Sequence, residues 1–183
     1  MALKATIHRI ELQVSDLDHH HYAEHPLTVA RHPSETEERM MVRVLAFALH
    51  AYEGPAFGRG ISSDDEPDLW CVDDTGAVKH WIELGLPDER RLRKAAGRAD
   101  AVSLYTYGAR GVDVWWKQNG GLLAGLANLA VWQVPYEASQ ALAKLADRTM
   151  RLTCTIQEGQ VWMADASDTV PVVLQSLKAP TER

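Results

Sequence analysis

Two acidic residues lie on either side of a predicted β-hairpin. The apolar runs 69–72 and 78–84 enclose the residues Asp-Asp-Thr-Gly, which are typical of a tight turn between two strands. If Thr75 and Gly76 are the two central turn residues, the strands pair so that Asp68 lies directly opposite Glu83 on one face. A three-residue turn would break this register, so the predicted pairing depends on the turn.

This acidic pair would suit a divalent cation. Directly opposed residues have Cβ atoms roughly 4.5–5.5 Å apart, and like charges at that distance are unfavourable. Carboxylate oxygens are hard ligands that suit Mg²⁺ or Mn²⁺, and either ion would neutralise both charges. Glu83 also interrupts the apolar run 81–84, where an unpaired carboxylate is costly. An ion pair between Glu83 and a neighbouring arginine would explain the same features, and the sequence leaves both explanations open.

The helix predicted after the hairpin carries a row of cations. It begins near Pro87, with acidic residues in its first turn, and runs to about residue 96. Arg91, Lys94 and Arg98 recur at positions i, i+3 and i+7, so they share one helix face. This face is either a solvated helix surface or a phosphate-facing row beside the acidic pair.

A helix nearer the N-terminus offers a third acid. Ser34 and Glu37 form a capping-box pattern, and apolar residues at helical spacing follow until the Gly-Pro at residues 54–55. Glu37 and Glu38 both lie close to the apolar face of this helix. Either side chain would reach toward a sheet, although acids in a first turn commonly serve only to complement the helix dipole.

The remaining pattern indicates an α/β (α+β) protein with a mixed central sheet, flanking helices and a second, antiparallel sheet. We expect the antiparallel sheet to combine an N-terminal hairpin with the C-terminal strands. No linker or repeat divides the sequence, which predicts a single domain over residues 1–183. Strands are predicted over 4–14, 21–31, 101–107, 112–116, 128–134, 150–156, 160–164 and 169–177, and a further helix over 136–148.

Composition and charge predict a soluble, cytoplasmic protein. None of the apolar runs approaches the ~18 residues that span a membrane, and the N-terminal residues do not resemble a signal peptide. Cys71 and Cys154 each lie within an apolar run, as buried thiols do in a reducing compartment. The net charge of −6 argues against broad affinity for nucleic acid but leaves room for a local basic groove.

Histidines gather near the first predicted turn. His19, His20 and His21 are consecutive, and His25 follows four residues later. This spacing raises the possibility of a metal site, but a histidine-rich turn is more commonly a solvated turn. We therefore interpret the cluster as a solvated, histidine-rich turn.

Five segments spread over nearly the whole sequence resemble the YaeQ family. They are Ala30–Glu35, Glu38–Met41, Asp64–Pro67, Trp81–Gly85 and Asp147–Met150. The resemblance implies a variant of the PD-(D/E)xK nuclease-like fold, in a family for which no activity is established. In that superfamily a helix precedes a β-hairpin, and acids on the two strands hold Mg²⁺.

The same resemblance assigns roles to particular residues. Asp68 matches the acid of the first strand, Glu83 that of the second strand, and Glu38 the acid on the preceding helix. The superfamily also has a lysine two residues after the second acid, and this chain has Gly85 there. Lysine migrates to the following helix in some nuclease-like folds, which points to Lys94, with Arg98 as a substitute. The acidic pair and the basic helix after it, together with this resemblance, lead to the hypothesis of a Mg²⁺-dependent phosphodiesterase acting on nucleic acid. The departure at Gly85 equally suits a non-catalytic module that binds nucleic acid or a protein.

Overall fold

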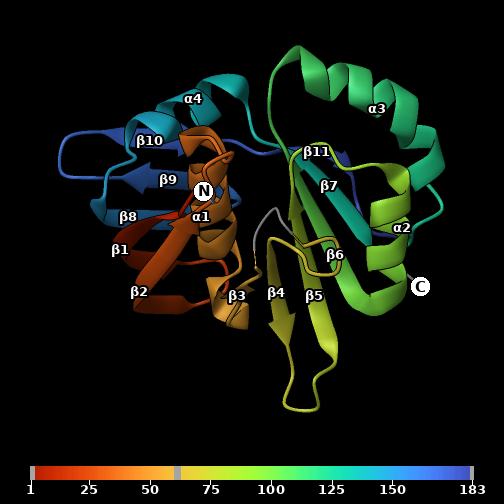
Figure 1. Ribbon diagram of the computed structural model, residues 1–183, viewed down its shortest axis with the longest axis horizontal. Coiled ribbons are helices and arrows are strands. Elements are labelled where there is room, and N and C mark those ends of the chain that lie inside the picture. The colour runs from red at the N-terminus through yellow and green to blue at the C-terminus, as the bar shows by residue number, and fades with distance from the viewer. Residues whose placement is uncertain (1–2, 60–62, 182–183) are drawn as a thin grey trace. The chain divides into compact units, whose positions relative to one another are not determined.

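The computed structural model describes residues 3–59 and 63–181 of the 183-residue chain, which form two compact units (Figure 1). The first unit combines residues up to 53 with residues 137–173, and the second combines residues 54–136 with the segment from 174 onward. Each unit is described by itself below, and the single domain over residues 1–183 stays a prediction. Among the described residues, no helix has the length and apolar character needed to cross a membrane.

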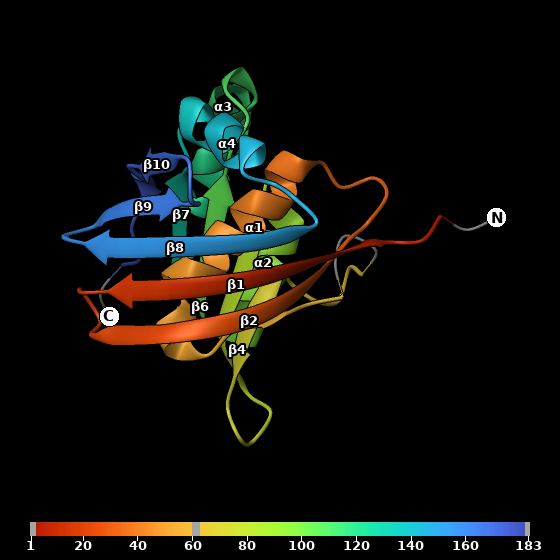
Figure 2. The same cartoon turned by 90° about the vertical axis from the view of Figure 1, so that its left-hand side faces the viewer.

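The first unit is built on a five-stranded sheet, whose strands β8, β1 and β2 lie side by side in Figure 2. The strand order is β10-β9-β8-β1-β2. As predicted, it joins the N-terminal hairpin to the C-terminal strands, but β1 and β8 pair in parallel, so the sheet is mixed. A parallel pair needs a crossover connection, and the long stretch between β2 and β8 supplies it. The strands are β1 (Thr6–Asp16), β2 (His21–Arg31), β8 (Thr149–Gln157), β9 (Gln160–Ala164) and β10 (Thr169–Val172).

Two helices and a short 3-10 turn complete this unit: α1 (Glu37–Leu49), η1 (Ala51–Glu53) and α4 (Tyr136–Lys144). Helix α1 is capped by Thr36, whose hydroxyl accepts a hydrogen bond from the Arg39 amide at 3.1 Å. The predicted cap, Ser34, instead lies in the preceding turn and bonds to His32 Nδ1 at 2.7 Å. Helix α4 is shorter than the predicted 136–148, because the chain leaves the helix after Lys144 to enter β8.

The second unit has a six-stranded sheet in the order β11-β7-β6-β5-β4-β3. Strands β5, β6 and β7 are parallel to one another, and antiparallel strands extend the sheet at both edges. Its elements are β3 (Ala56–Phe57), β4 (Leu69–Val72), β5 (Val78–Leu84), α2 (Glu89–Arg98), β6 (Ala99–Thr106), α3 (Arg110–Leu123), β7 (Leu129–Gln133) and β11 (Gln175–Lys178).

The core of this unit lies between the parallel strands and the helices α2 and α3. Helix α2 contributes Leu92 to it, and β5, β6 and α3 contribute residues such as Trp81, Leu104 and Trp115, all at most 8% exposed. One apolar stripe of helix α2 therefore packs against the sheet, and the polar side chains lie on the other faces of the helix.

Two predictions about the strands were wrong. Residues 112–116 are not a strand but part of α3, because a parallel β6–β7 pair requires a crossover element, and the buried Val112 and Trp115 recur at helical spacing. The run 169–177 is not one strand either. It divides into β10 in the first unit and the start of β11 in the second.

Candidate functional site

The hairpin of β4 and β5 brings Asp68 and Glu83 together. Leu69 pairs with Ile82, and Trp70 pairs with Trp81, so one further step along the ladder sets Asp68 opposite Glu83. This is the register that the sequence predicted. Both carboxylates are buried, at 4% and 3% exposure, which makes the pair unusual among the charged residues of the chain.

The turn itself differs from the prediction. The Asp73 amide donates to the Ala77 carbonyl at 3.0 Å, which encloses a three-residue loop rather than a two-residue one. Farther along, the register shifts by one residue, because Val72 pairs with Val78 whereas Cys71 pairs with His80. The bulge thus adds one residue to β5 and restores the parity that the longer loop removes. Asp68 and Glu83 face each other because these two departures cancel.

Hydrogen bonds fix the orientation of each buried carboxylate. Asp68 Oδ2 accepts a hydrogen bond from the Leu84 amide at 2.9 Å, across the two strands. Glu83 Oε1 accepts one from Trp81 Nε1 at 2.8 Å. Trp81 is two residues before Glu83, so both side chains leave the same face of β5. Burial raises the pKa of the Glu83 carboxyl, and the nearby negative charge of Asp68 raises it further, while the bonds from Arg91 and Trp81 oppose this.

Arg91 forms an ion pair with Glu83. Its Nε atom lies 3.0 Å from Glu83 Oε1, and a terminal guanidinium nitrogen lies 2.8 Å from the same oxygen. The guanidinium also donates to the backbone carbonyls of Asp64, at 3.2 Å, and Glu66, at 2.9 Å. The ion pair that the sequence left open is therefore present, and Arg91 in the first turn of α2 supplies it.

The other two cations of the predicted row hold the segment before β4. Lys94 Nζ lies 2.8 Å from Asp65 Oδ1, and this contact lowers the pKa of the Asp65 carboxyl. Arg98 donates to the Asp65 carbonyl at 3.2 Å and lies over the Trp81 ring, 5.4 Å from its centroid. The three cations share a face, as predicted. In this structure they bind residues 64–66 and Glu83, and Lys94 is paired with Asp65 rather than with the buried acids.

Gly85 occupies the position at which the nuclease-like superfamily pattern has a lysine. Its φ is +90°, and its amide donates to the Tyr105 carbonyl at 3.0 Å, which ties the end of β5 to β6. Residues with a Cβ are strained by roughly 1–2 kcal/mol in left-handed backbone conformations. A lysine is thus disfavoured at this position by the backbone itself.

Glu38, the predicted third acid, belongs to the first unit. Its carboxylate accepts hydrogen bonds from Ser139 Oγ at 3.4 Å and from the side-chain amide of Gln140, both on α4. These bonds tie α1 to α4. The assistance of Glu38 at a metal site stays a prediction.

Sequence reasoning missed the contributions of Trp81 and Asp65. The alternation of side chains along a strand would have identified Trp81, because it shares a face with Glu83. Asp65 lies in an irregular segment, and its pairing with Lys94 follows only from the tertiary fold. In chemical terms, Asp68 and Glu83 are two acids that would hold a hard divalent cation, and Arg91 is a guanidinium that would bind an anion.

Comparisons with known proteins identify the family of this chain. A family model described as "YaeQ protein" matches residues 1–174. The chain is similar to "Uncharacterized protein YaeQ" of Escherichia coli (strain K12) and that of Salmonella typhi, each 45% identical over 181 residues, covering 99% of this chain and 100% of the relative.

Solved structures agree with these sequence matches. The crystal structure of YaeQ from Xanthomonas axonopodis pv. citri has a TM-score of 0.92 at 46% identity, covering 96% of this chain and 99% of the other. That of YaeQ from Pseudomonas syringae has a TM-score of 0.91 at 40% identity, covering 96% and 97%. The mixed α+β architecture is thus shared with these structures. The chain belongs to the YaeQ family.

Proposed function

We propose that Asp68 and Glu83 bind a divalent cation, Mg²⁺ or Mn²⁺, and that the protein uses it to cleave phosphodiester bonds in nucleic acid. The observation that carries this proposal is the pair of opposed, buried carboxylates at the mouth of the hairpin. Two buried acids directly opposite each other bring like charges together, which is costly in a protein interior. A divalent cation would neutralise both carboxylates.

The donor set of the two acids fits a hard cation. The hydrogen bonds to Glu83 from Trp81 and Arg91 all reach Oε1, and the Leu84 amide reaches only Oδ2 of Asp68. The two acids thus present carboxylate oxygens toward each other across the strands, and oxygen ligands are those that Mg²⁺ and Mn²⁺ prefer. When bound, such an ion lowers the pKa of a coordinated water and stabilises charge on a phosphoryl oxygen.

The residues around the pair would orient it and receive the substrate. The Trp81 indole and the Leu84 amide hold the two carboxylates in place before any ligand arrives. Arg91 would move from Glu83 to a phosphate, which a guanidinium can bind through two parallel hydrogen bonds. The exposed pair of Lys94 and Asp65 is weak because solvent screens it, so Lys94 would be available to orient the nucleophile.

A second candidate function is supported by Gly85 and by the pairing of the cations. The backbone conformation of Gly85 disfavours the lysine of a nuclease site, and Arg91 already neutralises part of the charge on Glu83. These two observations favour a non-catalytic module that binds nucleic acid or a protein. Such a module would bind without a divalent ion and would weaken when Arg91, Lys94 and Arg98 are neutralised.

Cleavage and binding assays with matched variants separate the two functions. The intact protein is incubated with single- and double-stranded DNA and RNA, with Mg²⁺, with Mn²⁺ or with a chelator. We expect cleavage that requires the ion and is lost in Asp68→Asn and Glu83→Gln, while circular dichroism shows both variants folded. Binding that survives the chelator and falls steeply with salt, without cleavage, would support the second function instead. If the intact protein binds no divalent ion and cleaves none of these substrates, the first function is wrong.

A further inference from the structure

Two histidines on one strand of the first unit face each other. His21 and His25 belong to β2, which confirms the strand predicted over 21–31, and both are partly buried on the same side of the sheet. Their Nε2 atoms are 3.0 Å apart, and their ring centroids are 5.2 Å apart with 26° between the planes. Both imidazoles therefore present the same nitrogen to a common point.

A small residue makes this approach possible. Residues four apart on a strand are separated by about 13 Å along the backbone, so the two rings must lean toward each other. The residue between them on that face is Ala23, whose methyl group leaves the space open. A larger side chain at this position would separate the rings.

The rings are held by neighbours on β1 and α1. His25 packs its ring against the edge of Phe47, with centroids 5.4 Å apart. On β1, Leu12 pairs with His25 and Asp16 pairs with His21. Asp16 is 1% exposed, and its carboxylate accepts hydrogen bonds from the amide and the Nδ1 atom of His19, at 3.0 and 2.8 Å. The end of the hairpin next to His21 thus also holds the imidazole of His19 and the buried carboxylate of Asp16.

The geometry of the pair is suited to a metal ion. Imidazole nitrogen is a common metal ligand, and the two Nε2 atoms already lie close to each other. Within residues 3–59 and 63–181, the rings of His21 and His25 hydrogen-bond only to each other, through their Nε2 atoms. Metal–nitrogen bonds of about 2.0–2.1 Å at a tetrahedral angle would hold two such nitrogens about 3.3 Å apart, so a small rotation of the rings admits an ion.

We propose that His21 and His25 are two ligands of a site for a divalent transition metal ion that prefers imidazole, of the class of Zn²⁺, Ni²⁺ and Cu²⁺. The remaining coordination positions are open to water or to a small ligand. This site is separate from Asp68 and Glu83, whose oxygen atoms suit Mg²⁺ or Mn²⁺. Its chemistry does not depend on the phosphodiesterase proposal.

Calorimetric titration of the full chain with ZnCl₂, NiCl₂ and CuCl₂ tests the site. Changes to residues behind a metal ligand weaken binding by about 10–100-fold, so losing one of two ligands should cost at least as much. We expect His21→Ala and His25→Ala each to lose one equivalent of bound ion. We expect binding to weaken at acidic pH, because protons compete for imidazole nitrogen, and MgCl₂ not to occupy the site.

Control variants make the outcome decisive. His20→Ala removes an exposed histidine of the adjacent turn and should leave binding unchanged. Ala23→Leu keeps both histidines but separates their rings, so it should weaken binding as much as removing one ring. Circular dichroism confirms that each variant is folded. If the histidine variants bind as many equivalents as the intact protein, or if no transition metal binds, the facing rings are only a hydrogen-bonded pair and the proposal is wrong.

Discussion

Replacing Arg91 by glutamine tests how the acidic pair is balanced. The change removes the cation that contacts Glu83 at 2.8 Å but keeps a side chain of similar length. Breaking a buried ion pair by removing one partner costs about 3–5 kcal/mol. Since the Arg91 side chain is 25% exposed, solvent compensates for part of this loss, and we expect a decrease of about 1–3 kcal/mol in the free energy of unfolding. Urea denaturation at neutral pH measures it.

The same change should strengthen the binding of a divalent cation. In the intact protein an ion must displace Arg91 from Glu83 or share the carboxylate with it. Hydrogen bonds to charged groups contribute about 1.5–3 kcal/mol net, so removing this competitor should tighten Mg²⁺ or Mn²⁺ binding by roughly 10–100-fold. Isothermal titration of the intact protein and Arg91→Gln gives the two affinities directly. Adding the ion should also restore part of the lost stability, because it binds only the folded state.

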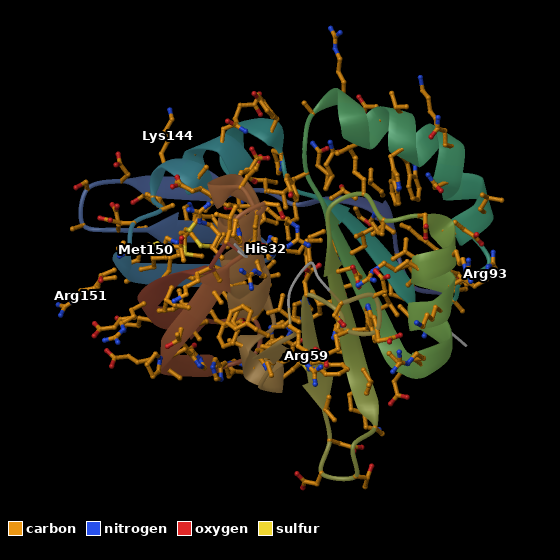
Figure 3. All side chains as sticks on the ribbon, in the orientation of Figure 1. His32, Arg59, Arg93, Lys144, Met150 and Arg151 are labelled. Carbon is orange, nitrogen blue, oxygen red and sulfur yellow. The ribbon has the colours of Figure 1, made fainter. Side chains whose placement is uncertain are left out.

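Arg93 provides the matched control. It lies on the same helix and projects away from the sheet (Figure 3), where it pairs with Glu89. Arg93→Gln removes one positive charge from α2 without touching the acidic pair, so it should change neither the stability nor the affinity appreciably. If Arg91→Gln binds the ion no more tightly than Arg93→Gln does, Arg91 does not compete for Glu83. The competition between Arg91 and the ion for the Glu83 carboxylate would then be refuted, even if the ion binds at Asp68.

Three further predictions follow from the hairpin. The pKa of Glu83 is raised in the folded state, so its contribution to stability is present at low pH and is lost as pH rises through that pKa. Glu83→Gln should abolish this loss. Unfolding curves recorded from acidic to neutral pH measure it. Hydrogen bonds from Thr75 and Ala77 lower the pKa of Asp73 to about 2, so its contribution is present above the ordinary carboxyl range and lost as pH falls toward 2. Asp73→Asn should remove that dependence, measured by the same curves. Gly85→Lys introduces a lysine at the position that the nuclease-like superfamily pattern gives it. It should lower the free energy of unfolding by about 1–2 kcal/mol because φ is +90°, and a thermal melt at unchanged or higher temperature would contradict this.

The sequence predicted the acidic pair correctly for a reason that was partly wrong. A two-residue turn at Thr75 and Gly76 predicted a register that sets Asp68 opposite Glu83, and Glu83 interrupts the apolar run 81–84. The actual loop is longer by one residue, and the bulge near Lys79 compensates. No local signal distinguishes these two arrangements, because a bulge depends on how the strand twists against its neighbours.

Physical reasoning from the sequence could have identified Arg91, rather than Lys94, as the cation of α2 that contacts Glu83. Glu83 lies at the carboxyl end of β5, and α2 begins five residues after that strand ends. The first turn of α2 is therefore the part of the helix closest to Glu83, and Lys94 is about 4.5 Å farther along the helix axis than Arg91. The family pattern directed attention to a lysine, whereas the helix geometry favours the arginine. By contrast, the pairing of Lys94 with Asp65 depends on the path of an irregular segment and could not be predicted.

The acidic pair itself is not explained by stability. A buried ion pair contributes little compared with apolar residues of the same shape, and replacing such a pair with apolar residues is often neutral or stabilising. Trp81 leaves the same face of β5 as Glu83 and is buried, so apolar side chains pack on that face, yet Asp68 and Glu83 place two buried acids opposite each other. A fold optimised for stability alone would have no use for two opposed acids. Such a pair has a chemical use where a cation or a proton is to be bound, which is why the proposed function rests on Asp68 and Glu83 rather than on the basic face of α2.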